Sequence, residues 1–410
     1  MTSFNDFGLA EPITRALAHE NYVLPTPIQV DAIPLVLAGR DLIGIAQTGT
    51  GKTAAFALPI LNRLAAKPRP PEKKTCKVLV LSPTRELSGQ ILDSFSTYGR
   101  QLRIRTALAI GGVPMGRQVR ALMDGVDVLV ATPGRLIDLV RSNALRLNGV
   151  EVLVLDEADR MLDMGFIHDI RKIVAKTPAQ RQTLLFSATM PREIAELASE
   201  MLRDPARVAV TPVASTVERV VQRVIHTDRA GKPGLLIDVL RGEPVERALV
   251  FTRTKHGADR VVRGLANAGI AAEAIHGNKS QGQRERVMAN FRAGRIQTLI
   301  ASDIAARGID VDGISHVINY DLPNIPESYV HRIGRTARAG ADGVAISFCD
   351  AEEAAFLRDI EKLIGLSIPA TGGQPGAHRG ARAAASRPPP RHAAPSGGAP
   401  KPSRRRRRGK

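Results

Sequence analysis

Val150-Glu-Val-Leu-Val-Leu-Asp-Glu-Ala-Asp159 gives the strongest indication of the fold in this sequence. Its first part, Val150 to Leu155, is an apolar run that predicts a buried strand. Three carboxylates follow at once, on Asp156, Glu157 and Asp159. In an open α/β sheet, ligands bind at the carboxyl ends of the strands. We therefore predict a parallel sheet with a ligand site at this end of it.

A second signature lies upstream, Ala46-Gln-Thr-Gly-Thr-Gly-Lys-Thr53, between a predicted strand and a predicted helix. Gly49 and Gly51 allow backbone dihedral angles that other residues avoid, and they let the backbone approach a phosphate closely. The N–H groups of such a loop and the helix N-terminus attract anions. Lys52 can reach the β- and γ-phosphates, and the Thr53 hydroxyl can bind Mg²⁺.

Together the two signatures predict a site for magnesium and a nucleoside triphosphate. Asp156 is the expected magnesium ligand, and Glu157 is expected to orient or deprotonate the attacking water. Each signature has a plainer alternative. The loop could be a glycine-rich turn before a helix, and the acids could be a helix N-terminus favoured by the helix dipole.

Apolar runs alternate with helical stretches along most of the chain, which favours a parallel sheet covered on both faces. The clearest strand candidates in the first half are 42–46, 78–81, 126–131, 152–155 and 183–186, and those in the second half are 248–251, 271–275, 297–301, 316–319 and 344–348. The pattern predicts two α/β domains, residues 1–205 and 219–369, joined by a linker at 206–218. The two halves share no convincing internal sequence repeat.

Composition narrows the function. The 410 residues carry a net charge of +18, and residues 371–410 hold 11 Lys and Arg with no Asp or Glu, so the first 370 residues account for +7. We expect a polyanionic partner, with nucleic acid the first candidate. Residues 370–410 are rich in Gly, Pro, Ala and Arg, which predicts a disordered basic tail. No long apolar run or signal pattern is present, and two distant cysteines fit a reducing, cytoplasmic location.

The combination of phosphate loop and Asp-Glu-Ala-Asp resembles the DEAD-box ATP-dependent RNA helicases. Pro25-Thr-Pro-Ile-Gln29 resembles the adenine-reading motif of that family, with Gln29 on the adenine edge and Phe4 stacked on the base. The resemblance covers about residues 1–369. The subgroup most similar to the chain is the bacterial RhlE type. Departures are few, with Ala46, Asn21 and Ala337 at positions where Gly is usual and Ser302 where Thr is commoner.

Further segments extend the resemblance through both halves of the chain. The family motifs imply RNA contacts in the first half at Pro83, Thr84, Arg85, Gly112, Thr132, Pro133, Gly134 and Arg135, and in the second half at Arg253, Thr254, Gly277 and Ser302. They imply nucleotide contacts at Thr48, Gly49, Thr50, Gly51, Lys52, Thr53 and Asp310. They assign catalytic roles to Lys52, Asp156, Glu157, Arg335 and Arg338, and coupling of ATP turnover to strand separation to Asp159, Ser187, Thr189 and His331.

The resemblance implies two tandem RecA-like domains with ATP and Mg²⁺ between them. It implies an RNA-dependent ATPase that unwinds short duplexes and remodels RNA or RNA–protein complexes when the domains close. RNA would be held mainly through phosphates, so binding would be largely independent of sequence. Proteins of RNA processing or ribosome assembly are possible partners.

Two other functions remain open, an ATP-gated RNA clamp that serves as a platform for other proteins and a DNA-directed helicase. The tail is interpreted as a flexible anchor for RNA, with a solubility tail or a localisation signal as the alternatives.

Overall fold

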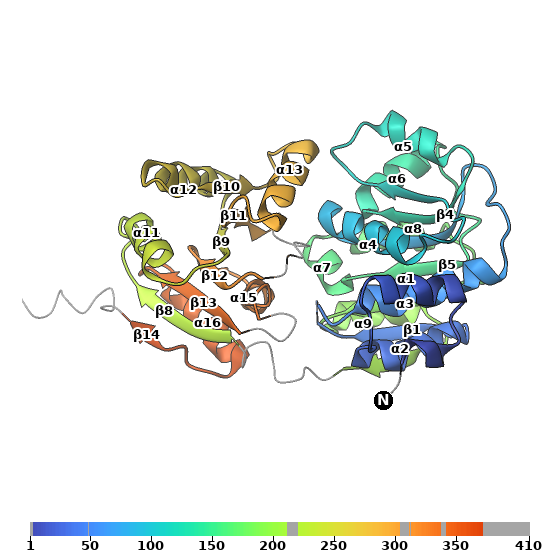
Figure 1. Ribbon diagram of the computed structural model, residues 1–410, viewed down its shortest axis with the longest axis horizontal. Helices are drawn as coiled ribbons and strands as arrows, with labels where there is room; N and C mark the ends of the chain where they lie inside the picture. The colour runs from blue at the N-terminus through green and yellow to red at the C-terminus, as the bar shows by residue number, and fades with distance from the viewer. Residues whose placement is uncertain are drawn as a thin grey trace, which may run out of the picture.

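The first half of the chain forms a seven-stranded parallel sheet in the order β3-β4-β2-β5-β6-β1-β7 (Figure 1). The computed structural model describes residues 3–47, 49–210, 220–303, 311, 313–337 and 342–371. The strands are β1 (Leu42–Ile45), β2 (Cys76–Leu81), β3 (Thr106–Ala109), β4 (Val126–Ala131), β5 (Val152–Leu155), β6 (Gln182–Ser187) and β7 (Ala206–Ala209). The helices are η1 (Phe4–Phe7), α1 (Glu11–His19), α2 (Pro27–Leu37), α3 (Lys52–Ala66), α4 (Arg85–Tyr98), α5 (Met115–Leu122), α6 (Pro133–Arg141), α7 (Ala158–Asp163), α8 (Ile167–Val174) and α9 (Arg192–Met201).

The central strands are apolar at almost every position because both faces of the sheet are covered. Val78 and Val80 of β2 belong to a core that also includes side chains of α1 to α4. Leu79 and Leu81 belong to a second core on the opposite face, shared with α5 to α9. Successive side chains of a strand point to opposite faces, so one continuous apolar run fills both cores.

The second half repeats this design with a sheet in the order β10-β11-β9-β12-β13-β8-β14. Its strands are β8 (Val220–His226), β9 (Ala248–Thr252), β10 (Ala272–Ile275), β11 (Thr298–Ser302), β12 (His316–Asn319), β13 (Gly343–Cys349) and β14 (Ala370–Thr371). Its helices are α11 (Lys232–Gly242), α12 (Lys255–Asn267), α13 (Gln281–Arg292), α15 (Pro326–Ile333) and α16 (Ala354–Ile364). The predicted fold class, two parallel sheets flanked by helices, is confirmed.

The two sheets have the same strand order when the strands of each are numbered from its own first strand. The strand in the sixth position is β1 in one sheet and β8 in the other, and each is followed by a helix that begins with a Gly-Lys pair at its N-terminus. The halves are therefore related in structure although the sequence shows no convincing repeat.

The domain boundaries differ from the sequence prediction by a few residues. Ala206–Ala209, assigned above to the linker, is strand β7 and pairs with β1, so the first sheet extends beyond residue 205. Ala370–Thr371, assigned to the tail, pairs with β8. Both strands lie at sheet edges and pair with one neighbouring strand each, and Val208 of β7 also packs into the first core. The rest of the linker, 211–219, and residues 372–410 lie outside the described residues.

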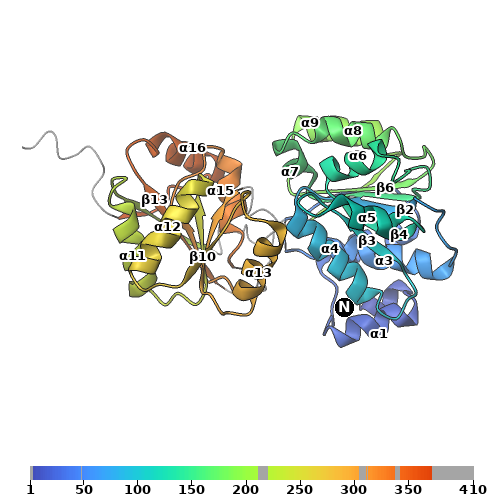
Figure 2. The ribbon, with the colours of Figure 1, turned by 90° about the horizontal axis from the view of Figure 1, so that it is seen from above.

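The predicted phosphate loop, carboxylates and RNA contacts of the first domain follow strands and so reach the same edge of the sheet, whereas Phe4 and Gln29 lie in η1 and α2, before β1. The phosphate loop follows β1, Asp156 follows β5, and Ser187 ends β6. Pro83 and Thr132 follow β2 and β4 in the same way. Seen from above, α4 of the first domain lies beside α13 of the second (Figure 2). The carboxyl edge of the first sheet therefore faces the second domain.

Candidate active site between the two domains

The phosphate loop has the backbone shape that its glycines predict. Gly49 and Gly51 have φ angles of 87° and 91°, in the left-handed region, and Gly51 caps the N-terminus of α3. A Cβ atom on Gly51 would collide with the Gln29 side-chain amide. The Thr50 hydroxyl donates to the Gln47 carbonyl at 2.8 Å and closes the turn. Thr48 lies outside the described residues.

Lys52, the first residue of α3, is buried with 6% of its surface exposed. Within the described part of the chain its ammonium group has no hydrogen-bond partner. A buried charge without a partner is costly, and it is stabilised when an anion reaches it. The loop, the helix N-terminus and this ammonium group together fit a phosphate chain.

The two carboxylates expected to bind the metal and the water lie beside Lys52. Asp156 and Glu157 are 2% and 3% exposed, and the Glu157 N–H donates to Asp156 Oδ1 at 2.9 Å. Burial raises the pKa of the Asp156 carboxyl to about 6, while Lys52 opposes the shift and Glu157 reinforces it. Glu157 has a φ of 54°, a strained value for a residue with a side chain.

The donor set suits Mg²⁺ better than a metal held by protein alone. Within the described ranges, no group of three or more His, Cys, Asp and Glu side chains could hold a metal ion. Magnesium usually keeps several waters and takes one or two carboxylates together with phosphate oxygens. Asp156 and Thr53, which line the same hollow as Lys52, fit that requirement in a site that also holds a triphosphate.

Asp159 points away from this pair and binds the segment that follows β6. Its Oδ2 accepts from the Thr189 N–H and hydroxyl, both at 2.9 Å, and from the Ala188 N–H at 3.2 Å. Its own N–H donates to Ser187 Oγ at 3.1 Å. Through its N–H and its carboxylate, Asp159 thus connects Ser187 and Thr189 to the segment that carries Asp156 and Glu157.

The residues expected at the adenine end are only partly on the surface. Gln29 is 2% exposed and uses one amide hydrogen for the Gly51 carbonyl at 3.1 Å and one oxygen lone pair for the Thr26 N–H at 3.0 Å. Phe4 is buried against Phe7 and Tyr22. Tyr22 is 39% exposed. Sequence reasoning missed Tyr22, although an aromatic three residues before the Pro25 motif in a chain with 3% aromatics was an available signal.

One hollow of about 230 Å³ is lined by the phosphate loop, the two carboxylates and Tyr22, and we call it the phosphate-loop hollow. The first domain contributes most of its lining, and the second contributes Arg335, which is 3% exposed. The described lining residues are Tyr22, Gly49, Gly51, Lys52, Thr53, Ala54, Leu87, Gln90, Ser94, Tyr98, Asp156, Glu157 and Arg335. Arg335, far away in sequence, therefore lies in the same hollow as the phosphate loop and the carboxylates. Arg338 and Asp310 lie outside the described residues.

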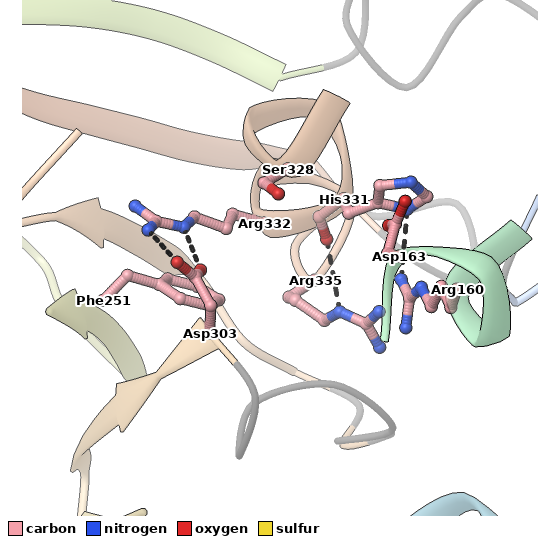
Figure 3. A pocket seen from close by; sticks show the side chains of 8 residues that line it. All are labelled: Arg160, Asp163, Phe251, Asp303, Ser328, His331, Arg332 and Arg335. Carbon is pink, nitrogen blue, oxygen red and sulfur yellow. Dashed lines mark hydrogen bonds and ion pairs between the residues drawn. The ribbon is translucent and has the colours of Figure 1, made fainter. Parts of the chain in front are cut away.

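A second, smaller hollow borders the first on the side of the second domain (Figure 3). Arg335 Nε donates to the His331 carbonyl at 3.3 Å, and His331 Nδ1 lies 3.1 Å from Arg160 Nη2. Burial, reinforced by Arg160, lowers the pKa of His331 to about 4, so the ring is neutral near pH 7. Arg332 is held separately by two bonds to the Asp303 carboxylate, at 2.6 and 2.7 Å.

Arginines from both domains lie close together near Arg85, one of the residues expected to contact RNA. Arg85 lies over Gly112, where a Cβ atom would collide with its guanidinium group. Burial lowers the pKa of Arg85, and the positive charges of Arg284 and Arg135 lower it further. Arg135 donates to the Val113 carbonyl at 2.9 Å. Arg284 and Arg135 are thus close enough to repel Arg85, and Glu86, which pairs with Arg284 at 2.7 Å, offsets part of this effect.

Other first-domain residues expected to contact RNA lie at the N-termini of helices. Thr84 caps α4 by accepting from the Leu87 N–H at 3.3 Å, directly after Pro83. Thr132 precedes α6, whose first residues are Pro133 and Gly134. Their backbone therefore lies at the same edge as Arg85 and Arg135.

The second-domain residues expected to contact RNA are spread over several elements. Thr254 caps α12 by accepting from the Gly257 N–H at 3.0 Å, while Gly277 is exposed after β10 and Ser302 ends β11. Arg253 is already engaged, because it donates to Glu353 Oε1 at 2.6 Å and covers the Phe356 ring.

Glu353 belongs to a buried charge cluster centred on Lys232, the first residue of α11. The Lys232 ammonium lies 2.6 Å from Glu353, 3.2 Å from Asp350 and 3.6 Å from Asp321. Lys232 is 1% exposed. Three carboxylates from this domain therefore surround the ammonium group, in contrast to Lys52.

No described helix is both long and apolar enough to span a membrane.

Comparison with known proteins gives two family matches along the chain. Residues 26–197 match the DEAD/DEAH box helicase family, and residues 231–340 match the helicase conserved C-terminal domain. RNA helicase CrhR of Synechocystis is 46% identical over 361 residues, covering 88% of this chain and 72% of that protein. DEAD-box ATP-dependent RNA helicase CshA of Geobacillus kaustophilus is 44% identical over 362 residues, covering 88% and 76%. The solved structure of S. cerevisiae Dbp5 bound to RNA and ADP BeF3 is 31% identical, with a TM-score of 0.80 over 91% of this chain and 96% of that one.

Proposed function

Because the chain belongs to the DEAD-box ATP-dependent RNA helicases, we propose that it hydrolyses ATP in the phosphate-loop hollow when RNA brings its two RecA-like domains together. ATP hydrolysis then drives the separation of short RNA duplexes and the remodelling of RNA or RNA–protein complexes. One observation carries the proposal. Arg335 of the second domain shares a hollow with Lys52, Thr53, Asp156 and Glu157 of the first.

The first domain holds the triphosphate. The unpartnered Lys52 ammonium and the N–H groups around Gly49, Thr50 and Gly51 receive the β- and γ-phosphates. Thr53 and Asp156 would hold Mg²⁺, and the bound ion would neutralise charge on the phosphate oxygens. Glu157, buried beside Asp156, orients the water that attacks the γ-phosphate.

The second domain completes the site. Arg335, together with Arg338, places positive charge on the γ-phosphate as negative charge develops in the transition state. In other phosphoryl-transfer enzymes a positioned arginine contributes about 10³–10⁵ in rate. Hydrolysis is therefore fast only while the domains are closed. RNA that contacts both domains favours closure, so ATP and RNA each strengthen the binding of the other.

The adenine ring lies between Gln29 and Tyr22. Gln29 still has one amide hydrogen and one oxygen lone pair after its bonds to Gly51 and Thr26, and this is the complement of the N6 and N7 edge of adenine. Tyr22 offers an exposed ring for stacking. We therefore assign the stacking role to Tyr22, with Phe4 supporting it from the core.

RNA binds across Arg85, Gly112 and Arg135 of the first domain and Thr254, Gly277 and Ser302 of the second. These contacts go to phosphates and sugars, so they carry no base sequence. Phosphates bound beside Arg85 would offset the repulsion that Arg284 and Arg135 exert on it.

The test is ATP hydrolysis by the full chain without nucleic acid, with single-stranded RNA and with single-stranded DNA of the same sequence. We expect RNA to raise kcat by more than about tenfold, because closure adds the arginine contribution. DNA should have little effect, and Lys52→Ala should abolish the RNA-stimulated rate. Absence of RNA stimulation would rule out the proposal.

Strand separation is measured next, on a short RNA duplex with ATP. RNA-stimulated hydrolysis without strand separation would identify a clamp that serves as a platform for other proteins. Equal stimulation by DNA would identify a helicase without preference for RNA.

A further inference from the structure

Arg160, the residue directly after Asp159, joins the two domains at the catalytic carboxylate. It is 3% exposed and belongs to α7 of the first domain. Its Nη1 donates to Glu157 Oε2 at 3.0 Å, and its Nη2 lies 3.1 Å from His331 Nδ1 in the second domain. Figure 3 shows Arg160 reaching from α7 toward His331, with Arg335 beside them.

The bond to His331 fixes the state of that ring. An arginine is always protonated and can only donate, so Nδ1 must be the unprotonated nitrogen and accept the bond. The proton of the neutral ring is then on Nε2. Burial favours this neutral ring, whose pKa is lowered to about 4. The contact is therefore a charge-assisted hydrogen bond across the domain boundary.

The guanidinium group suits two partners at once because it is planar and carries separate donors in a rigid fork. In this arrangement the orientation of the fork is set jointly by Glu157 and His331. If the second domain moved away, Nη2 would lose this acceptor, and the fork would no longer be held from both sides. The position of the Glu157 carboxylate is thereby linked to the position of the second domain.

We propose that Arg160 is a positioning residue that couples domain closure to the placement of Glu157. This inference rests on the proposed function, because it requires Glu157 to orient the attacking water. Arg160 is not among the described residues that line the phosphate-loop hollow. It acts through Glu157 at one end and senses His331 at the other, so the catalytic carboxylate is held in place when the second domain is seated.

The two ends can be separated by substitution. Arg160→Lys keeps a positive charge beside Glu157, but a single ammonium group cannot reproduce the fork that also reaches His331. His331→Ala removes the acceptor and leaves the Arg160–Glu157 pair, and it spares the backbone carbonyl that binds Arg335. Arg192→Lys is the matched control, because Arg192 pairs with Glu196 on α9 and its side chain is 89% exposed.

The readout is the factor by which a non-hydrolysable ATP analogue tightens RNA binding, measured with the full chain. A fold-stabilising role alone would not change this factor. We expect Arg160→Lys and His331→Ala each to lower it by roughly tenfold, the range for a hydrogen bond to a charged group. The double variant should be no worse than the more affected single variant, because both remove the same bond. Arg192→Lys should match the wild type.

Several outcomes would overturn the coupling role of Arg160. Additive losses in the double variant would mean that the two residues act separately. An unchanged factor in His331→Ala would also refute it, even if Arg160→Lys folds poorly. The result for the wild-type protein distinguishes failure of the Arg160 proposal from failure of the proposed function. A wild type in which the analogue and RNA do not help each other contradicts the proposed function, whereas a coupled wild type with unaffected variants contradicts only the role of Arg160.

Discussion

At the residue scale, Glu157 combines features that stability alone does not explain. It is buried, has a left-handed backbone and lies next to a second buried carboxylate. Strained backbone conformations persist at functional sites because the surrounding structure imposes them. Here the strain turns the chain sharply between β5 and α7, so that Asp156 and Glu157 face the phosphate loop while Asp159 faces Ser187 and Thr189.

Glu157→Gln keeps the shape of the side chain and removes its charge. We expect the variant to bind ATP and RNA within a few-fold of the wild type, while single-turnover hydrolysis falls by about 10²–10⁴, the usual contribution of a general base. Glu193→Gln, on the exposed side of α9, is the control and should be neutral. Substantial hydrolysis by Glu157→Gln would remove Glu157 from the catalytic role.

At the element scale, the sequence predicted the central strands well and several outer strands poorly. The candidates 126–131, 152–155 and 316–319 coincide with β4, β5 and β12. Central strands are buried on both faces, so they read as continuous apolar runs. The edge strand β7 is half exposed, so its residues alternate and the run is lost. Strand β3 alternates as well, and β8 buries only Val220 and Val224 of its seven residues, so both strands also escaped the prediction.

The residues of the candidate site also fall into those that the sequence could predict and those that it could not. Residues next to one another in sequence, such as Lys52 with Thr53, could be predicted because a loop between strand and helix fixes their geometry. Contacts between distant segments could not be predicted from spacing. Arg160 with His331 and Glu86 with Arg284, the latter at 2.7 Å, depend on how the two domains meet.

The turn after α15 keeps a left-handed backbone at Ala337, a position where the family usually has Gly. Ala337, at a position where the family usually has Gly, has a φ of 55°, and Asn21, at another such position, has 57°. Left-handed backbone costs a residue with a Cβ atom roughly 1–2 kcal/mol, although Asn tolerates it better than Ala. The chain therefore retains the glycine-type turn without the glycine.

We predict that Ala337→Gly stabilises the protein by up to about 1 kcal/mol, because relief of the left-handed strain exceeds the entropy cost of glycine. The same change in a regular helix, Ala195→Gly in α9, should destabilise by about 1 kcal/mol. The free energy of unfolding from denaturant titration measures both. Changes of the same sign in the two variants would contradict the assigned backbone strain.

At the scale of the whole molecule, two lysines occupy equivalent places in the two sheets and have different surroundings. Lys52 begins the helix after β1, and its ammonium group has no hydrogen-bond partner among the described residues. Lys232 begins the helix after β8, and its ammonium group is surrounded by Glu353, Asp350 and Asp321. An anion is therefore attracted to the first position and repelled at the second.

We expect the full chain to bind one ATP analogue, not two, because only the first of these lysines is available to a phosphate. Titration calorimetry with a non-hydrolysable analogue measures the stoichiometry directly. Lys52→Ala should abolish the binding. Lys67→Ala, at the exposed residue that follows α3, is the matched control and should retain it. Two bound analogues per chain, or undiminished binding by Lys52→Ala, would contradict the difference between the two lysine positions.

The shared strand order and the paired Gly-Lys helix starts have a consequence for the history of the chain. Duplication of one nucleotide-binding module would leave this pattern. One copy would then have kept its lysine available for a ligand, while the lysine of the other gained internal counterions. The second copy, with no nucleotide of its own to hold, would be free to act on the nucleotide held by the first.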